Sequence, residues 1–236
     1  MSIKVVLFDL DGTLLPMDQD VFVKTYFGML AKTLAPYGYE PEHLIDAVWK
    51  GTYAMIKNNG EKSNEQVFWD TFSAIYKTDV KGDLPLFDNF YRTKFDDVKA
   101  SCGFNPEAAE TVAEIKAMNL RIALATNPIF PAIATESRIR WAGLKADDFE
   151  AYTTYENSHF SKPNPEYFKD VADRLGVEPK ECLMVGNDVD DDLPAAQVGM
   201  KVFLLTDCLI NKSNTDFSLI PNGGFAELLS FIKENI

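Results

Sequence analysis

Short apolar runs that alternate with helical patterns constrain the fold of this chain most strongly. The first run, residues 3–10, is continuously apolar and ends in an acidic turn. Four further runs have the same character and cover residues 121–127, 150–155, 181–187 and 201–207. Helices are indicated between them, for example at Asn105-Pro106 and Asn164-Pro165, where Asn can cap a helix that Pro begins. Continuously apolar strands separated by helices predict a parallel α/β sheet covered on both faces.

The segment from about residue 16 to residue 99 follows a different pattern. Apolar residues recur there at spacings of three and four, which indicates about four helices. The expected buried faces are Phe22, Tyr26, Met29 and Leu30; Ile45, Val48, Trp49, Thr52 and Ile56; Phe68, Phe72, Ile75 and Tyr76; and Phe87, Phe90, Tyr91, Phe95 and Val98. We interpret the segment as a helical domain inserted after the first strand, whose aromatic residues mainly form its own core. One or two of them could contact a substrate.

The charge balance restricts the partners of the chain. Asp and Glu number 36 against 23 Lys and Arg, so the net charge is −13 and an extended nucleic acid is not expected as a partner. A small anionic metabolite remains compatible. Signal-peptide and membrane-span patterns are absent from the sequence, and the cysteines have neither metal-finger nor disulfide-framework spacing, so we expect a cytoplasmic protein. The oligomeric state is not predictable.

Two carboxylates end the first predicted strand. Asp9 and Asp11 are two residues apart and point the same way if the strand continues through them, and Gly12 then lets the backbone turn. A carboxylate can attack phosphorus and form an acyl phosphate. A second carboxyl group nearby can protonate the leaving oxygen and later deprotonate water. An acidic turn is common after a strand, but Asp9 to Thr13 in this context is much more specific than two aspartates alone.

Phosphate-binding groups follow two later positions in the chain. Thr126 and Asn127 end the strand at residues 121–127, where a hydroxyl and an amide can bond phosphate oxygens. Lys162 is followed by Pro163 just before a helix, and its compact cation suits a phosphate or a group of carboxylates. Each of these signals is weak on its own. In a parallel sheet, however, ligands bind at the carboxyl ends of the strands, so the groups can converge.

An acidic segment follows the strand at residues 181–187. It contains four aspartates within five residues, Asp188 and Asp190 to Asp192, preceded by Asn187. Such a group repels itself unless a cation or solvent intervenes. Oxygen ligands of this kind suit Mg²⁺, which is usually held by one or two carboxylates together with phosphate and water. The alternative is a solvated acidic loop that begins a helix, since carboxylates favour a helix N-terminus.

Together the four segments resemble the four motifs of the haloacid dehalogenase-like superfamily, in order and each after the expected strand. The resemblance covers nearly the whole chain. It implies a Rossmann-like, doubly wound core formed by residues 1–15 and 100–236, with the first strand central in the sheet. Residues 16–99 would form a helical cap of the family's first class.

The resemblance also implies roles for these residues. Asp9 is expected to be the nucleophile and Asp11 the general acid and base, in a Mg²⁺-dependent hydrolysis of a small phosphorylated metabolite through an aspartyl phosphate. Phosphate binding would fall to Thr126, Asn127 and Lys162. The metal ligands would be Asp9, the carbonyl of Asp11 and residues of the fourth segment.

The fourth segment departs from the family pattern, which commonly has Gly-Asp and a second Asp four or five residues later. Here Asn187 follows Gly186. Either Asn187 or Asp188 supplies the metal-binding oxygen; we favour Asp188 together with Asp192. Asp191 is the other candidate for the second carboxylate.

Most other functions on related folds differ from this pattern in one or more motifs or in length. Dehalogenases of the family lack a carboxylate at the position of Asp11, and phosphonatases have Ala there. A sugar phosphomutase keeps the same motifs and stays open as the alternative. A phospho-receiver module shares an acidic pocket and a Lys-Pro, but it is about half this length and has no inserted helices. A catalytically silent binding protein is disfavoured because every motif is present.

Overall fold

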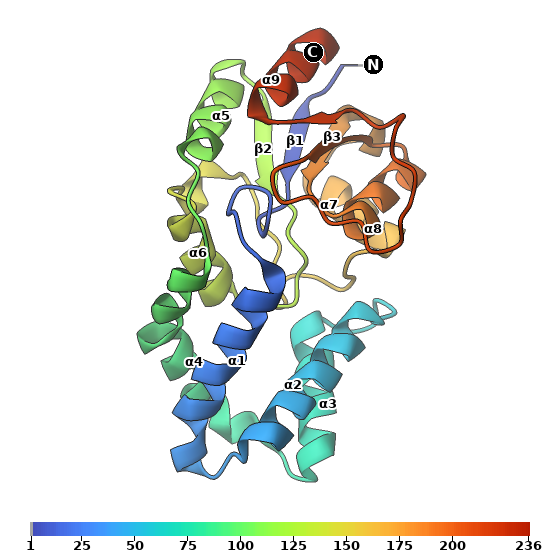
Figure 1. The fold of residues 1–236 in the computed structure, drawn as a ribbon. Coiled ribbons are helices and arrows are strands. Elements are labelled where there is room, and N and C mark those ends of the chain that lie inside the picture. Colours follow the sequence, from blue (N-terminus) through green and yellow to red (C-terminus); the bar gives the residue numbers. More distant parts are fainter. Residues whose placement is uncertain (1) are drawn as a thin grey trace.

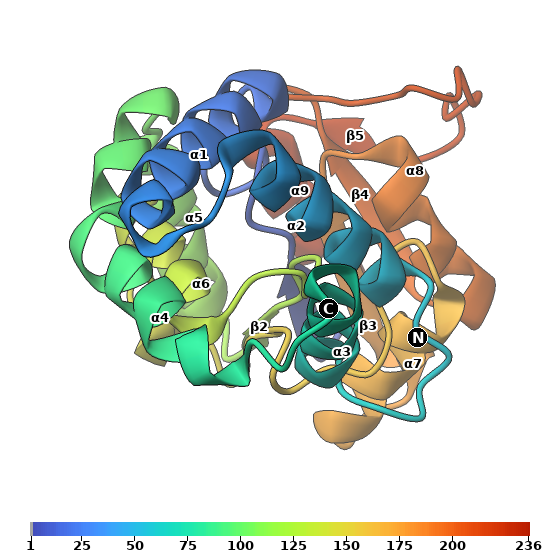
Figure 2. The ribbon, with the colours of Figure 1, turned by 90° about the horizontal axis from the view of Figure 1, so that it is seen from below.

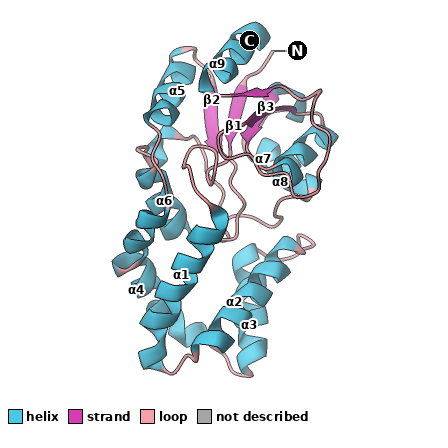
Figure 3. Cartoon of the chain, viewed as in Figure 1, coloured by secondary structure: helices cyan, strands magenta, loops and turns pink. Residues whose placement is uncertain are grey.

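A parallel sheet forms the centre of the computed structural model, which describes residues 2–236 (Figures 1 and 3). The strand order is β2-β1-β3-β4-β5 and every pairing is parallel, so β1 lies inside the sheet between β2 and β3. The strands are β1 (Val5–Phe8), β2 (Arg121–Leu124), β3 (Cys182–Gly186), β4 (Lys201–Leu205) and the short β5 (Asn222–Gly223). The predicted α/β fold class is therefore confirmed.

Helices cover both faces of the sheet. Val6 and Phe8 of β1 belong to one apolar cluster with α5 (Pro106–Ala117) and α9 (Phe225–Asn235). Val5 and Leu7 belong to the opposite cluster with α7 (Pro165–Arg174). Successive side chains of a strand point to opposite faces, so a strand that is apolar at every position must be covered twice. The helix starts predicted from Asn105 and Asn164 are also confirmed, because both residues cap their helices through their side chains.

Four helices between β1 and α5 extend from the carboxyl end of the sheet. They are α1 (Gln19–Leu34), α2 (Pro41–Ile56), α3 (Asn64–Tyr76) and α4 (Leu84–Thr93), followed by a 3₁₀ helix at Phe95–Ser101. We call residues 19–101 the helical segment. Seen from below, α1 and α4 lie to one side and α2 and α3 to the other (Figure 2). No helix among the described residues is long and apolar enough to cross a membrane.

Two connections join the helical segment to the sheet, and they lie side by side. The backbone N–H of Gly103 donates to the carbonyl of Pro16 at 2.7 Å, and Met17 forms an antiparallel bridge with Cys102. Apart from these two connections, Asn64 at the start of α3 also attaches the helical segment to the core. Its side-chain amide donates to the carbonyl of Pro128 and to Oγ of Ser161, next to the predicted phosphate-binding residues.

The buried face of α2 differs from the predicted one. The helix buries Leu44, Ala47, Gly51 and Met55, besides Val48. Gly51 allows close packing on α3, because a Cβ there would lie 2.6 Å from the ring of Phe68. Of the predicted face, Trp49 is 49% exposed, and Ile45, Thr52 and Ile56 are only partly buried. Thus α2 has two apolar sides, and the one predicted to be core mostly lines cavities.

The predicted strand at residues 150–155 is also different. This segment runs beside β2, with the N–H of Thr153 donating to the carbonyl of Leu124 at 3.1 Å, but it forms only one isolated bridge, at Tyr152. The Oγ1 of Thr153 instead donates to the carbonyl of Thr126 at 2.7 Å. The segment therefore supports the end of β2 and does not extend the sheet as a regular strand.

Candidate active site

One cleft of about 340 Å³ at the carboxyl ends of the strands collects every side chain predicted to carry chemistry. Its lining includes Asp9, Asp11, Thr126, Asn127, Lys162, Asn187, Asp188, Asp191 and Asp192. These residues follow β1, β2 and β3, and Lys162 comes from the loop before α7. The convergence expected of a parallel sheet is thus present. The helical segment closes the cleft from the other side, with Phe22, Val23, Trp49, Thr52 and Ile56.

Asp9 follows β1 directly and is held firmly. Its backbone N–H donates to the carbonyl of Val185 on β3 at 2.8 Å. Its carboxylate accepts at Oδ1 from Nζ of Lys162 at 2.9 Å and at Oδ2 from Oγ1 of Thr13 at 3.2 Å. Burial raises the pKa of Asp9 to about 7, against the opposing effect of the Lys162 ammonium group. Thr13, the last residue of the first motif, therefore orients the expected nucleophile.

Lys162 is buried between two carboxylates. Its Nζ contacts Oδ1 of Asp9 at 2.9 Å and Oδ1 of Asp192 at 2.7 Å. Burial opposes the charge on Lys162, but the carboxylates of Asp192 and Asp9 raise its pKa well above the ordinary value. Asp192 is itself buried, and its Oδ2 accepts from the N–H of Asp188 at 3.0 Å. Asp192 thus fixes Lys162 and the loop after β3 at once.

Thr126 and Asn127 lie at the end of β2. The carbonyl of Thr126 accepts from the hydroxyl of Tyr167 at 2.8 Å as well as from Thr153, which fixes this corner from behind. Nδ2 of Asn127 donates to Oδ2 of Asp191 at 3.2 Å. Oδ1 of Asn127 is buried without a hydrogen-bond partner among the described residues. An unpaired buried oxygen is costly, and it is a feature expected where a ligand completes the site.

The side chains of the fourth segment, which follows β3, make different contacts. Oδ1 of Asn187 lies 2.8 Å from Oγ1 of Thr13, so it shares the single hydroxyl proton of Thr13 with Asp9, and Nδ2 of Asn187 donates to the carbonyl of Cys208 at 2.7 Å. Asp188 caps the short helix α8 (Val189–Asp192), and both of its bonds use Oδ1. Gly12 permits this approach of the two loops, because a Cβ there would lie 2.2 Å from Nδ2 of Asn187.

Asp191 and Asp190 have different environments although they are adjacent in sequence. Burial raises the pKa of Asp191 to about 6, partly offset by Lys162. Asp190 is partly exposed; its carboxylate accepts a hydrogen bond from the backbone N–H of Ser213, and it does not line the cleft. The acidic segment is therefore not uniformly solvated. Three of its aspartates belong to the site and one to the surface.

The oxygen atoms of the cleft fit a hard divalent cation. Asp9 and Asp188 offer carboxylates and Asn187 an amide oxygen, all on the same lining. Across the part of the chain described by the structure, no group of three or more His, Cys, Asp or Glu side chains is arranged to hold a metal alone. An ion here would need a carbonyl, the Asn187 oxygen or phosphate as well, which is usual for Mg²⁺.

Arg138 is a site residue that the sequence did not indicate. It lies on α6 (Ala132–Trp141), its side chain is fully buried, and its Nη1 donates to Oδ2 of Asp11. The guanidinium also lies over the ring of Phe130, with Cζ 4.3 Å from the centroid. Oδ1 of Asp11 is buried and has no hydrogen-bond partner in residues 2–236. A single Arg in a helix carries no sequence signal, so only the packing of α6 reveals it.

The fold and the cleft define a protein with a parallel α/β core and an acidic site at the carboxyl ends of its strands. A sequence model of the haloacid dehalogenase-like hydrolases matches residues 3–199, and the chain belongs to this family. Pyrophosphatase PpaX of Bacillus cereus (strain AH820) is 24% identical over 202 residues, which cover 85% of this chain and 82% of the relative.

Solved structures resemble the chain over nearly its whole length. A HAD phosphatase from Thermococcus onnurineus aligns with a TM-score of 0.60 at 19% identity, covering 98% of both chains. A 2-haloacid dehalogenase from Pseudomonas syringae pv. Tomato aligns with a TM-score of 0.64 at 21% identity, covering 98% of this chain and 99% of the other. Phosphatases and dehalogenases thus share this fold, and the choice between them depends on the side chains of the cleft.

Proposed function

We propose that the protein is a Mg²⁺-dependent phosphatase that hydrolyses phosphate monoesters of a small metabolite through an aspartyl phosphate on Asp9. The observation that carries the proposal is the geometry of Asp9. Its carboxylate stands at the end of an internal strand, fixed by Lys162 and Thr13, with Asp11 two residues away. A dehalogenase has no use for the carboxylate of Asp11, and this supports a phosphatase.

In the first step Asp9 attacks phosphorus in line and the bond to the leaving alcohol breaks. Lys162 remains beside the transferred group and neutralises part of its charge, while Thr126 and Asn127 offer a hydroxyl and an amide to the phosphoryl oxygens. Such positioning and charge stabilisation supply most of the catalysis in phosphoryl transfer. In the second step water attacks the aspartyl phosphate and regenerates Asp9.

Asp11 moves the proton in both steps. It gives a proton to the leaving oxygen in the first step and takes one from water in the second. Arg138 donates to Oδ2, so Oδ1, which is buried and unpaired among the described residues, is the oxygen that would carry this proton. In this proposal Arg138 holds Asp11 through Oδ2 and leaves Oδ1 for the proton.

A bound Mg²⁺ would supply positive charge that favours ionised Asp9 and balances the phosphoryl group. The residues that would hold it are Asp9, the carbonyl of Asp11 and Asp188, whose Oδ2 is not used in capping α8. Asn187 is the alternative to Asp188. The carboxylate of Asp192 already binds Nζ of Lys162, so we propose that Asp192 orients this lysine and does not bind the metal.

The test is release of inorganic phosphate from a broad panel of phosphate monoesters, with Mg²⁺ or with EDTA. Asp9→Asn is the catalytic variant, and Asp190→Asn is the matched control on the surface. We expect release that requires Mg²⁺, is lost in Asp9→Asn and persists in Asp190→Asn. Isomerised sugar phosphates with little free phosphate would support a phosphomutase. A folded protein that does neither would contradict the proposal.

A further inference from the structure

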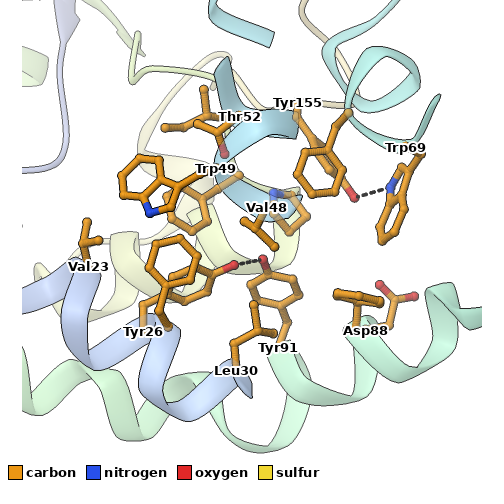
Figure 4. A pocket seen from close by; sticks show the side chains of 16 residues that line it. Val23, Tyr26, Leu30, Val48, Trp49, Thr52, Trp69, Asp88, Tyr91 and Tyr155 are labelled. Atoms are coloured by element: carbon orange, nitrogen blue, oxygen red, sulfur yellow. Dashed lines mark hydrogen bonds between the residues drawn. The ribbon is translucent and has the colours of Figure 1, made fainter. Parts of the chain in front are cut away.

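A second, mainly apolar cavity lies within the helical segment, between the pair α1 and α4 and the pair α2 and α3 (Figure 4). Its volume is about 80 Å³. Each of the four helices contributes to its wall, through residues such as Tyr26, Leu30, Val48, Phe68, Trp69 and Phe87. Part of this wall is the side of α2 that the sequence predicted to be core.

This cavity, which we call the apolar cavity, adjoins the catalytic cleft. Val23, Trp49, Thr52, Ile129 and Phe130 line both spaces. Ile129 and Phe130 come two and three residues after Asn127, so the phosphate-binding corner borders the apolar cavity. A group attached to a phosphate beside Asp9 would pass these five residues to enter it.

Four polar side chains in the wall are already paired with each other. The hydroxyls of Tyr26 and Tyr91 lie 2.9 Å apart, and Nε1 of Trp69 donates to the hydroxyl of Tyr155 at 3.4 Å (Figure 4). Among the described residues that line the apolar cavity, Asp88 is the only charged one. An apolar group can enter without leaving these polar atoms unpaired, whereas an anionic group meets a carboxylate and no cation.

We propose that the apolar cavity binds the end of the leaving alcohol, and that the substrates are phosphate monoesters of alcohols with a short aliphatic chain. This inference rests on the proposed phosphatase function and names its substrate class. The volume is about half of the ~150 Å³ that accepts benzene, which suits a few carbon atoms. Alcohols that end in a carboxylate or a second phosphate fit poorly, because the wall is mainly apolar and its charged residue, the exposed Asp88, is itself a carboxylate.

A chain-length series tests the proposal. The specificity constant kcat/KM is measured for n-alkyl phosphates from methyl to hexyl, whose alcohols have similar basicity. The comparison series consists of alkyl phosphates of equal length that end in a carboxylate. We expect kcat/KM to rise about fourfold for each methylene that enters the apolar cavity and then to level off. The carboxylated esters should lose this gain.

Two matched substitutions locate the effect. Val48 lines the apolar cavity but not the cleft, and Val48→Phe fills part of it. Val67 lies on α3, is partly buried and lines neither space, so Val67→Phe makes the same change elsewhere. Val48→Phe should flatten the dependence of kcat/KM on chain length, and Val67→Phe should preserve it.

Binding without turnover gives an independent reading. Trp49 and Trp69 line the apolar cavity, so a ligand there changes tryptophan fluorescence. Titration of Asp9→Asn with alkyl phosphonates should give a Kd that falls with chain length. Phosphate release without dependence on chain length, or an unaltered dependence in Val48→Phe, would overturn this inference and leave the phosphatase function intact. No release from any ester would overturn the phosphatase function instead, and the phosphonate titration would still decide whether the cavity takes aliphatic chains.

Discussion

Arg138 donates through Nη1 to Oδ2 of Asp11, and its guanidinium lies over the ring of Phe130. The contact joins α6 to the loop after β1 across the buried side of the cleft. In the proposed mechanism, Oδ1 of Asp11 is the oxygen that exchanges a proton with substrate. We therefore propose that Arg138 is a positioning residue, because it acts through Asp11 and Phe130 and does not line the cleft.

Arg138→Lys should lower kcat by about ten- to a hundredfold and change KM little. Lysine keeps the charge but loses the planar contact with Phe130 and the fixed direction of the donor, so Asp11 is held less well. Steady-state kinetics on the best ester measure both constants. Arg140→Lys, two residues away on α6 and exposed, is the matched control and should behave like the parent. An Arg138→Lys enzyme with unchanged kcat would contradict the positioning role.

Lys162→Met should destabilise the protein by about 3–5 kcal/mol at neutral pH in the absence of divalent cations. The substitution leaves Asp9 and Asp192 facing each other without the cation that separates them. Urea denaturation measures the change. The control is Lys116→Met, which breaks an exposed pair with Asp148 and should cost under about 1 kcal/mol. Equal losses in the two variants would show that the buried pairs contribute nothing special.

Asp188→Asn should raise the Mg²⁺ concentration for half-maximal phosphate release at least about tenfold, because it removes the charge of a proposed ligand. An amide oxygen still caps α8, so the helix start is preserved. Asp190→Asn changes a neighbouring aspartate that does not line the cleft and should leave the Mg²⁺ requirement unchanged. If Asp188→Asn also left it unchanged, Asn187 would be the better candidate.

Asp191→Asn should stabilise the protein in EDTA at about pH 8, by on the order of 2 kcal/mol. Burial raises the pKa of Asp191 from 3.8 to about 6. A carboxyl group with a raised pKa favours folding only while protonated, so its contribution is present below about pH 4 and is lost by about pH 6. The gain should therefore nearly vanish at about pH 4. Urea denaturation at both pH values checks this; a gain independent of pH would refute the ionisation argument.

Much of the site could be predicted because it lies at strand ends. The position of Asp9, Asn127 and Asp188 in space follows from a parallel sheet, whose carboxyl ends meet at one edge whatever the intervening chain does. Helix N-caps such as Asn105 could also be predicted, because they depend only on neighbouring residues in the sequence. Arg138 could not be predicted, since its meaning depends on how α6 packs against a loop more than 120 residues earlier in the chain.

The error on α2 has a physical cause of the same kind. Its sequence offers two apolar sides at helical spacing, and periodicity cannot say which one packs. Gly51 decides, because the absence of a side chain lets Phe68 of α3 approach that side. The other side, with Val48 and Trp49, is then left to line the apolar cavity.

The central claim is that Asp9 itself becomes phosphorylated. The most direct measurement is mass spectrometry of the peptide that contains Asp9, after acid quenching of the protein mixed with its best ester and Mg²⁺. We predict one added phosphoryl group, located on Asp9, that disappears as free phosphate forms and is missing in Asp9→Asn. Phosphate release by an enzyme whose Asp9 never carries the group, or release that persists in Asp9→Asn, would contradict the mechanism.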